Sequence, residues 1–539
     1  MINILKFKTH PSIILFVLVL FGCGGGATNN ALTMNNIRPA PGEDDNNTLI
    51  TNNIRSTSDW IENYFLPELT YKNKCLNPRS GVNPETSSLY LDIKGTSLDE
   101  NNYLRSYTNN TYLWYDEVID RDPSLYSTES YFDLLKTSHD RFHFTYPTTE
   151  WIQLSQSGIS AGYGVSWINQ SNKIRVAYTE PNTPASSETV GLERGDEIIE
   201  VDGIKVTENI GSNFVNNILY PDTSGKTHTF LVKKRVSGET REISMTSDNI
   251  VSTPVQEIKI FERDSGKVGY FLFNDHIATS ESGLFDAITQ LKSNNIKNLV
   301  LDLRYNGGGY LAIANQLTYM IAGPILTAGI NFETMVFNDK HPNTNPVTGS
   351  PITPIPFYTT TIGLSSMQKN IDLPFLDLST GDSGYPKVFV ITGNDTCSAS
   401  ESIINSLMGL NIEVIQIGSV TCGKPYGFYP TDNCGTTYFT VQFKGINAKG
   451  YGDYGNGFKP RLIASDINMP KGCLINDDLD SSLGSTDEDR LSAALYYLDN
   501  GNCPIENIGR SPSKSITNST STDRISVKKN IFLTNRIFH

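Results

Sequence analysis

The chain has 539 residues, of which 38% are apolar and 19% charged, a composition typical of several packed domains rather than of a disordered or fibrous chain. A formal net charge of −14 repels phosphate backbones and argues against a nucleic-acid partner. The one long apolar run, Ile13 to Phe21, is shorter than the roughly 20 residues that cross a bilayer, so a polytopic membrane protein is excluded as well.

The first residues follow the pattern of an export signal, in which a short basic start precedes an apolar stretch. The four residues that end in Cys23 resemble a bacterial lipoprotein box, in which Cys23 is acylated and becomes the mature N-terminus. Phe21 differs from the small or β-branched residue usual there, and a simple secretory peptide is the alternative. We expect a signal peptide at 1–22 and a flexible tether at 23–57. The protein would then be lipid-anchored in the bacterial cell envelope and face the periplasm or the exterior.

Residues 58–154 are expected to form a small, mainly helical N-terminal region. Ser97-Leu98-Asp99-Glu100 has the form of a capping box, and the aromatic-rich stretch behind it predicts a helix packed on a core. A second short helix is expected over Glu129 to Thr137.

Six cysteines remain when Cys23 is set aside, which suits an exported protein with up to three disulfides. We favour Cys422–Cys434 and Cys473–Cys503, because each of these bridges closes a modest local loop. No Cys-x-x-Cys pair or histidine cluster in the sequence supports a zinc site, so we expect no metal.

From residue 155 onward, short strands and turns replace the helical pattern. Tyr163 to Trp167 and Ile174 to Tyr178 predict a hairpin, and Glu197 to Val201 predicts a buried strand that ends in a tight Asp202-Gly203 turn. A helix and a further strand are expected after them: Phe214 to Leu219 and Thr229 to Lys233.

This succession of elements over residues 155–248 resembles a PDZ domain, and the run from Gly191 to Gly203 is its most specific part. In that family the loop Gly162-Tyr163-Gly164-Val165 offers backbone N–H groups to the C-terminal carboxylate of a peptide, and the adjacent strand edge accepts the rest of the peptide. The resemblance therefore implies capture of an exposed polypeptide C-terminus. A small β domain that acts only as a spacer is the alternative.

Strands and helices alternate over residues 249–505, which predicts an α/β domain. The expected elements are the strands Val268 to Leu272, Leu299 to Leu303, Lys387 to Thr392 and Glu413 to Gly418, and the helices Ser282 to Ser293 and Ala399 to Leu410. Residues 506–539 are rich in Ser and Thr and are expected to form a disordered tail. The fold class is therefore multidomain α/β (α+β), with a helical N-terminal region, a PDZ-like domain and an α/β core.

Two turns that follow predicted buried strands carry residues suited to catalysis. The first contains Gly307-Gly308-Gly309, whose backbone N–H groups are unobstructed. The second places Ser398 at the start of a helix, where the positive end of the helix dipole favours a nucleophile and a developing oxyanion. Lys424 follows the next predicted strand, and it could accept the serine proton once burial lowers its pKa.

These motifs occur in a fixed order after the PDZ-like segment: Asp302-Leu303-Arg304-Tyr305-Asn306-Gly307-Gly308-Gly309, then Ser398-Ala399-Ser400-Glu401, then Gly423-Lys424. The order resembles the C-terminal processing (tail-specific) serine peptidases, and the resemblance covers roughly residues 155–505. It implies a Ser–Lys dyad in which Ser398 is the nucleophile and Lys424 the general base. The backbone N–H groups of Ala399 and of Gly308-Gly309 would stabilise the oxyanion.

Two positions depart from the family pattern. Phe428 stands where the family often has a Gln that orients the lysine, so another residue must position Lys424. Gly307 stands where the family has a Pro.

The sequence also permits other interpretations of these residues. Ser398 could be only a helix cap, with Ser400 as the fallback nucleophile. His276 keeps a Ser–His arrangement possible. Cys397 adjoins the site, but an exported cysteine is expected to be bridged rather than nucleophilic. At the end of the predicted strand, Asp302 and Arg304 are expected to brace the loop rather than to act as acid and base.

The predicted function is that of an exported serine endopeptidase that cleaves unfolded or C-terminally exposed polypeptides through an acyl-enzyme, without a cofactor. Two rivals remain. One is a catalytically silent relative that only binds peptides, and the other is a Ser–Lys amidase or esterase that acts on a small molecule.

Overall fold

The computed structural model describes residues 60–504, apart from 84–85, 210–212, 382–383 and 463–467, together with the two residues Arg536–Ile537. The expected signal peptide, Cys23, the tether and the rest of the tail lie outside the described residues. In the part of the chain that is described, no helix combines the length and the apolar character needed to span a membrane.

The N-terminal region is mainly helical, as expected. Its helices are α1 (Ser97–Thr111), α2 (Thr128–Leu134) and α3 (Thr148–Ser157), with the 3₁₀ turns η1 (Glu68–Thr70), η2 (Tyr115–Glu117) and η3 (Pro123–Leu125). Its strands are short: β1 (Lys74–Cys75), β2 (Val82–Asn83), β3 (Ser88–Leu89), β4 (Ile93–Lys94) and β5 (Phe144–Pro147). Aromatic residues of α1 and α2 form a small core of their own.

The predicted cap of α1 is wrong by one residue. Thr96 is the N-cap, because its hydroxyl accepts a hydrogen bond from the Asp99 N–H and the Asp99 carboxylate accepts one from the Thr96 N–H. The Glu100 carboxylate accepts a hydrogen bond from the Leu76 N–H instead, at 2.8 Å. The five residues from Thr96 to Glu100 contain two overlapping capping boxes, and the contact with Leu76, which the sequence does not predict, takes up Glu100.

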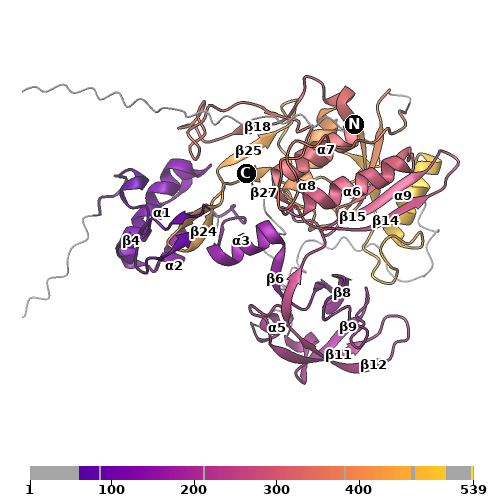
Figure 1. The fold of residues 1–539 in the computed structure, drawn as a ribbon, viewed down its shortest axis with the longest axis horizontal. Coiled ribbons are helices and arrows are strands. Elements are labelled where there is room, and N and C mark those ends of the chain that lie inside the picture. Colours follow the sequence, from indigo (N-terminus) through magenta and orange to yellow (C-terminus); the bar gives the residue numbers. More distant parts are fainter. Residues whose placement is uncertain are drawn as a thin grey trace, which may run out of the picture. The chain divides into compact units, whose positions relative to one another are not determined.

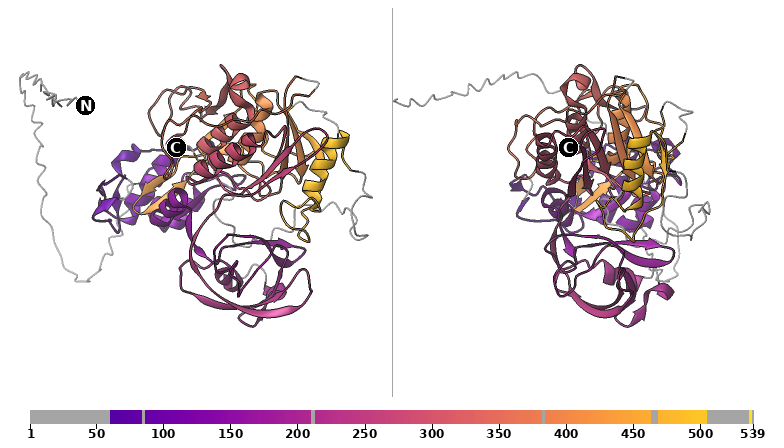
Figure 2. Two further views of the ribbon diagram at one scale, coloured as in Figure 1. Left: turned by 45° about the vertical axis from the view of Figure 1, so that its right-hand side comes forward. Right: turned by 90° about the vertical axis from the view of Figure 1, so that its right-hand side faces the viewer.

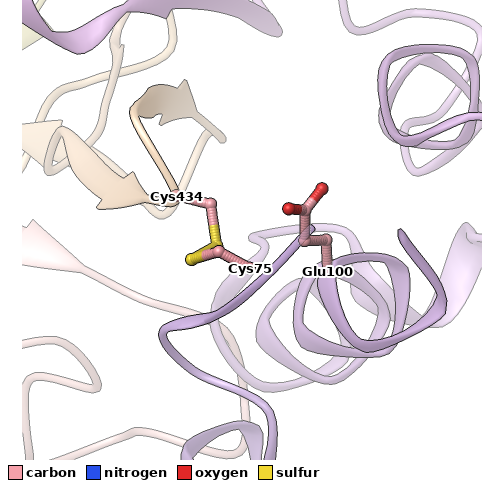
Figure 3. A group of neighbouring side chains, drawn as sticks. All are labelled: Cys75, Glu100 and Cys434. Carbon is pink, nitrogen blue, oxygen red and sulfur yellow. A yellow bond between two sulfur atoms is a disulfide. The ribbon is translucent and has the colours of Figure 1, made fainter. Parts of the chain in front are cut away.

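A strand pairing and a disulfide connect the N-terminal region to the α/β core, which lies far away in the sequence. Strand β5 pairs in antiparallel fashion with β24 (Thr436–Phe439), which in turn pairs with β23 (Thr431–Asn433). A disulfide joins Cys75 to Cys434 across 359 positions of sequence (Figure 3). The predicted Cys422–Cys434 bridge is therefore wrong, because proximity in the fold rather than in the sequence selects the partner.

The PDZ-like domain forms from the predicted elements. Its main sheet has the order β12-β11-β9-β8-β7, with β10 paired to β9, and all its pairs are antiparallel. The elements are β6 (Ile159–Gly162), β7 (Val165–Gln170), β8 (Lys173–Thr179), β9 (Glu197–Val201), β10 (Ile204–Lys205), α4 (Val206–Asn209), α5 (Asn213–Leu219), β11 (Thr227–Lys233), β12 (Thr240–Thr246) and β13 (Asp248–Val251). The domain has a separate apolar core around Trp167, Phe230 and Val232.

The α/β core is built on a six-stranded sheet in the order β14-β15-β16-β20-β21-β26. These strands are β14 (Val255–Phe261), β15 (Val268–Phe273), β16 (Asn298–Asp302), β20 (Lys387–Thr392), β21 (Glu413–Gly418) and β26 (Lys471–Leu474). Strand β14 is antiparallel to β15 and the other pairs are parallel. All residues of β16 are buried, as expected for a strand covered on both faces.

Helices cover both faces of this sheet. The helices α6 (Ser280–Ser293), α7 (Leu311–Thr327) and α8 (Ala399–Gly409) lie on one face, and α9 (Asp489–Asn500) lies on the other (Figures 1 and 2). Side chains on the two faces form separate apolar clusters. The smaller strands are β17 (Gly309–Tyr310), β18 (Asn331–Val336), β19 (Ile355–Pro356), β22 (Tyr426–Gly427), β25 (Phe443–Ile446) and β27 (Arg536–Ile537), which pairs with β17.

The sheet topology brings the predicted site residues to one edge. Parallel strands end at the same edge of a sheet, and this edge is where α/β proteins place their sites. The glycine turn follows β16, Ser398 follows β20 and Lys424 follows β21, and these three strands are neighbours.

Candidate active site

Ser398 sits between the end of β20 and the start of α8, in a backbone conformation that is rare for a residue with a side chain. Its φ is 60° and its ψ is −115°, so the turn holds the residue in a strained position at the head of the helix. A strained strand–serine–helix turn of this kind presents a nucleophile in other α/β enzymes. The hydroxyl is buried and has no hydrogen-bond partner in the described residues, so it does not serve as a helix cap.

Lys424 is fully buried and is therefore not a surface charge. Burial lowers the pKa of its amine to about 7, and the negative charges of Asp140 and Glu401 partly oppose that effect. At this pKa a large fraction of the amine is neutral near pH 7 and able to accept a proton. The rings of Phe142 and Phe428 lie 4.8 and 4.2 Å from Nζ.

The Glu401 carboxylate fastens the serine and lysine turns together. One of its oxygens, Oε2, accepts hydrogen bonds from the backbone N–H groups of both Ser398 and Lys424, at 2.9 and 2.8 Å. The other oxygen, Oε1, accepts from the Gly423 N–H at 2.8 Å and from the Thr421 hydroxyl at 2.5 Å. Burial raises the pKa of Glu401, whereas these donors favour the ionised form. The backbones of the two predicted dyad residues thus meet on a single oxygen atom.

A disulfide makes the same connection covalently. Cys397, the neighbour of Ser398, is bonded to Cys422, which lies two residues before Lys424, and their Cα atoms are 5.1 Å apart. Cys397 is therefore bridged, as expected, and is not a thiol nucleophile. The predicted bridge between Cys473 and Cys503 is confirmed.

Two disulfides decide whether two groups of cysteine and glutamate among the described residues could bind a metal ion. Two groups bring two cysteines and a glutamate together: Cys75, Glu100 and Cys434, and Cys397, Glu401 and Cys422. In both groups the sulfur atoms form a disulfide, so neither offers a thiolate ligand. Figure 3 shows the first of these groups.

The glycine turn approaches its neighbours very closely. A Cβ at Gly309, whose φ is 136°, would lie 2.4 Å from the carbonyl oxygen of His276, so only glycine fits there. The Gly308 N–H donates to Asn306 Oδ1 at 2.9 Å, and an oxyanion at Gly308 would have to compete with that amide. Ala399 is the first residue of α8, so its N–H has no acceptor within the helix.

Asn306 contacts both alternative candidates for catalysis, Ser400 and His276. The Ser400 hydroxyl donates to the Asn306 carbonyl oxygen at 3.0 Å, which disfavours Ser400 as the nucleophile. The His276 Nδ1 is 2.9 Å from Asn306 Oδ1, and burial lowers the pKa of His276 to about 3, so the ring is neutral. A ring with so low a pKa is a weak base near pH 7, and the Ser398 hydroxyl has no hydrogen-bond partner among the described residues.

Asp302 and Arg304 brace the glycine turn, as expected. The Arg304 guanidinium bonds to Asp302 and, through Nη1, to Glu488 at 2.6 Å and to Asp477 at 2.9 Å. Arg304 and Asp302 are fully buried, and the Tyr270 hydroxyl donates to Asp302 Oδ2 at 2.8 Å. This network holds the loop by charge-assisted hydrogen bonds.

The predicted peptide-binding loop lies in the PDZ-like domain, apart from the serine and lysine turns. Gly162 ends β6 and Val165 begins β7, which is the edge strand of its sheet in the described part of the chain. Tyr163 is buried, and a Cβ at Gly164 would lie 2.3 Å from Thr183. The loop therefore has a fixed shape beside an edge that can accept an added strand.

Asp140 and Phe142, which the sequence analysis missed, also lie at Lys424. They belong to the N-terminal region, and no motif connects them to a lysine that follows about 280 positions later. The role of Glu401 could be predicted more easily from the sequence, because Glu401 lies about one helical turn after Ser398 in the Ser398-Ala399-Ser400-Glu401 motif.

Serine peptidases are the class of protein that this fold and site fit best. A serine in a strained turn and a buried lysine whose amine has a lowered pKa lie on two turns that Glu401 and a disulfide join at the carboxyl edge of a covered sheet, and these are groups that acyl transfer requires.

One segment of the chain matches a known family of peptidases. Residues 267–427 match the family model of peptidase family S41, so the chain contains an S41 peptidase domain. The resemblance to C-terminal processing peptidases is thereby confirmed.

Two known proteins illustrate the likeness. A carboxyl-terminal-processing protease of Picosynechococcus sp. is 32% identical over 163 residues, which are 30% of this chain and only 38% of that protein. A crystal structure assigned to the S41 proteases, from Bacteroides fragilis, superposes with a TM-score of 0.54 at 24% identity and covers 74% of this chain and 97% of its own. At that identity the second likeness concerns the fold alone.

Proposed function

We propose that the protein is an exported serine endopeptidase of the C-terminal processing type, with Ser398 as nucleophile and Lys424 as general base. The observation that carries this proposal is the junction of the two turns. Glu401 Oε2 binds the backbone N–H of both residues, the Cys397–Cys422 bridge joins the turns covalently, and the Lys424 amine is buried with its pKa lowered to about 7.

The reaction follows from these groups. The Ser398 hydroxyl attacks the scissile carbonyl carbon while the neutral Lys424 amine takes its proton. The ammonium then gives the proton to the leaving amine, and an acyl-enzyme is left on Ser398. Water, deprotonated by the same amine, hydrolyses the ester. The backbone N–H groups of Ala399 and of the Gly308-Gly309 pair would stabilise the oxyanion at each tetrahedral stage.

The substrate and its capture belong to the same proposal. The loop Gly162-Tyr163-Gly164-Val165 would bind the carboxylate of an exposed polypeptide C-terminus, and the outer edge of β7 would accept the chain as an added strand. A lipid anchor on Cys23 and a place in the cell envelope rest on the sequence pattern alone. No cofactor is needed for the steps above.

The proposal is tested by substitution of the two dyad residues. Ser398→Ala and Lys424→Ala should each lower casein hydrolysis by at least about 1000-fold, because the nucleophile or its base is lost. Ser400→Ala is the matched control and should lose at most about tenfold, since its hydroxyl only bonds to Asn306. Circular dichroism checks that the variants stay folded.

The rival functions give different results in the same assay. A wild-type protein that leaves casein intact but binds C-terminal peptides would be a silent binding protein. One that hydrolyses small esters but no peptide would be an esterase. Activity that survives in Ser398→Ala but not in Ser400→Ala would move the nucleophile.

A further inference from the structure

Three consecutive residues of the N-terminal region lie against the turn that carries Lys424. The Phe142 ring is 4.8 Å from the lysine Nζ. The Arg141 guanidinium donates to the carbonyl oxygen of Cys422 at 2.5 Å. Of the two acids whose negative charges raise the pKa of the amine, Asp140 has the larger effect. A segment far away in the sequence therefore packs a ring against the lysine side chain, donates a hydrogen bond to the backbone of the lysine turn and places a negative charge near it.

The Asp140 carboxylate has a fixed position. Its side chain is buried, with 3% of the residue exposed. The Tyr112 hydroxyl donates to Oδ2 at 2.8 Å, and the Phe142 N–H donates to Oδ1 at 2.8 Å. Because each carboxylate oxygen accepts a hydrogen bond from a different donor, the side chain is held in one orientation.

The charged groups at the lysine turn come from two elements. Asp140 and Arg141 belong to the N-terminal segment, and Glu401 belongs to α8. All four hydrogen bonds of Glu401 described above go to Ser398 and to the residues Thr421, Gly423 and Lys424, three of them through backbone N–H groups. Glu401 thus holds the backbone of the turn, and of the two acids Asp140 acts more strongly on the amine.

We propose that the segment Asp140–Phe142 positions Lys424 as the general base, with Asp140 as the acidic partner that stabilises the ammonium formed when Ser398 gives up its proton. This inference rests on the proposed function. It assigns to the N-terminal region the task that a Gln four residues after the lysine has in the family pattern, where this chain has Phe428.

The two phenylalanine rings complete this arrangement. Phe142 and Phe428 both lie within 5 Å of Nζ, where an aromatic face attracts a cation more than a neutral amine. The rings exclude water and so keep the amine neutral before the reaction, while Asp140 and the ring faces limit the cost of the charge that appears during proton transfer. Neither ring can replace the charge of Asp140.

The test is the pH dependence of kcat/KM for a quenched peptide substrate, measured on the full chain. In Asp140→Asn the ammonium loses its partner, so the pKa of Lys424 falls and the acid limb of the profile should shift by about one pH unit to lower pH. At the optimum kcat should fall at least about tenfold, with KM little changed. Asp140→Glu keeps the charge and should keep the acid limb at its wild-type position.

Other titratable groups do not produce the same result. Tyr112, His143 and Tyr426 face Asp140, but burial raises the pKa of both tyrosines and lowers that of His143 to about 4. Burial also raises the pKa of Glu180 to about 7, but its hydrogen bonds go to Ser252, Thr253 and Gln256, so it contributes equally to every profile compared.

Asp120→Asn is the matched control. Asp120 is a buried acid of the same region that pairs with Arg105, and its loss should leave the acid limb in place. If Asp140→Asn does not fold, the smaller Asp140→Ser gives the same readout. An unshifted acid limb in a folded Asp140 variant, even one of lower activity, would overturn the inference, because a purely structural role lowers the rate at every pH alike.

Failure of this inference is distinct from failure of the proposed function. If the wild type hydrolyses the peptide and Ser398→Ala does not, the dyad stands whatever the Asp140 variants do. If the wild type is inactive, the proposed function fails first, and the inference fails with it.

Discussion

Lys424 carries a cost in stability that follows from its burial. In the unfolded chain the amine titrates near its ordinary pKa of 10.5, whereas in the folded protein the pKa is about 7. Between these values the unfolded state binds more protons, so the wild type loses stability as the pH falls from 10.5 to 7. Below pH 7 both states are protonated and the cost stays constant.

Lys424→Met removes this cost and should stabilise the inactive protein. At pH 7 the gain in the free energy of unfolding should approach about 4 kcal/mol, and it should shrink as the pH rises toward 10. Urea denaturation of both proteins at pH 7, 8.5 and 10 measures the difference. A difference that does not change with pH would show that the wild-type amine is not neutral when buried.

On the scale of elements, the site consists of the turns that carry Ser398 and Lys424. A disulfide and the hydrogen bonds of Glu401 hold these two turns together. The Cys397–Cys422 bridge closes a sequence separation of 25 residues, and Glu401 binds the backbone on both sides. Because the bridge adjoins Ser398 and nearly adjoins Lys424, its loss should affect activity more than a bridge elsewhere.

The double variant Cys397→Ser/Cys422→Ser should lose about 3 kcal/mol of stability and at least about tenfold in kcat. Cys473→Ser/Cys503→Ser is the matched control, because that bridge lies at β26 and beyond α9, away from both turns. It should lose comparable stability but keep kcat at temperatures where it is folded. Equal losses of kcat in the two variants would contradict a local role for the first bridge.

The sequence was a good guide to the elements near the site and a poor one to contacts across the chain. The expected strands Glu197 to Val201, Lys387 to Thr392 and Glu413 to Gly418 have the predicted bounds. Short runs rich in Val and Ile, with turn residues such as Gly, Asp or Asn nearby, encode such strands locally. The pairing of Cys75 with Cys434 and the contact of Phe142 with Lys424 are set by the tertiary fold, which local patterns do not encode.

On the scale of the whole molecule, Arg194 is one of the arginines that connect the PDZ-like domain with the core, and it is the one that reaches the glycine turn. Arg194 Nη2 bonds to Asp477 at 2.8 Å, and Nη1 bonds to the Tyr305 hydroxyl at 2.5 Å. Tyr305 lies in the glycine turn next to Arg304, which also bonds to Asp477. The turn that would stabilise the oxyanion is therefore linked to the domain that would capture the substrate.

Arg194→Met should break this connection without altering either dyad residue. The variant leaves Asp477 with Arg304 as a partner, so the cost in stability should be about 2 kcal/mol. We expect kcat/KM for a long peptide to fall about tenfold, because the glycine turn loses a support. Arg241→Met, which breaks a contact within the PDZ-like domain, is the control. Equal kcat/KM in both variants would argue against coupling through Arg194.

The central claim is that a neutral Lys424 activates Ser398, and labelling by a fluorophosphonate followed by peptide mapping tests it most directly. We expect one adduct, on Ser398, that forms faster as the pH rises through about 7 in the wild type. In Lys424→Ala the adduct should form at least about 100-fold more slowly. Rapid labelling of Ser398 in Lys424→Ala, or an adduct on another residue in the wild type, would contradict the account.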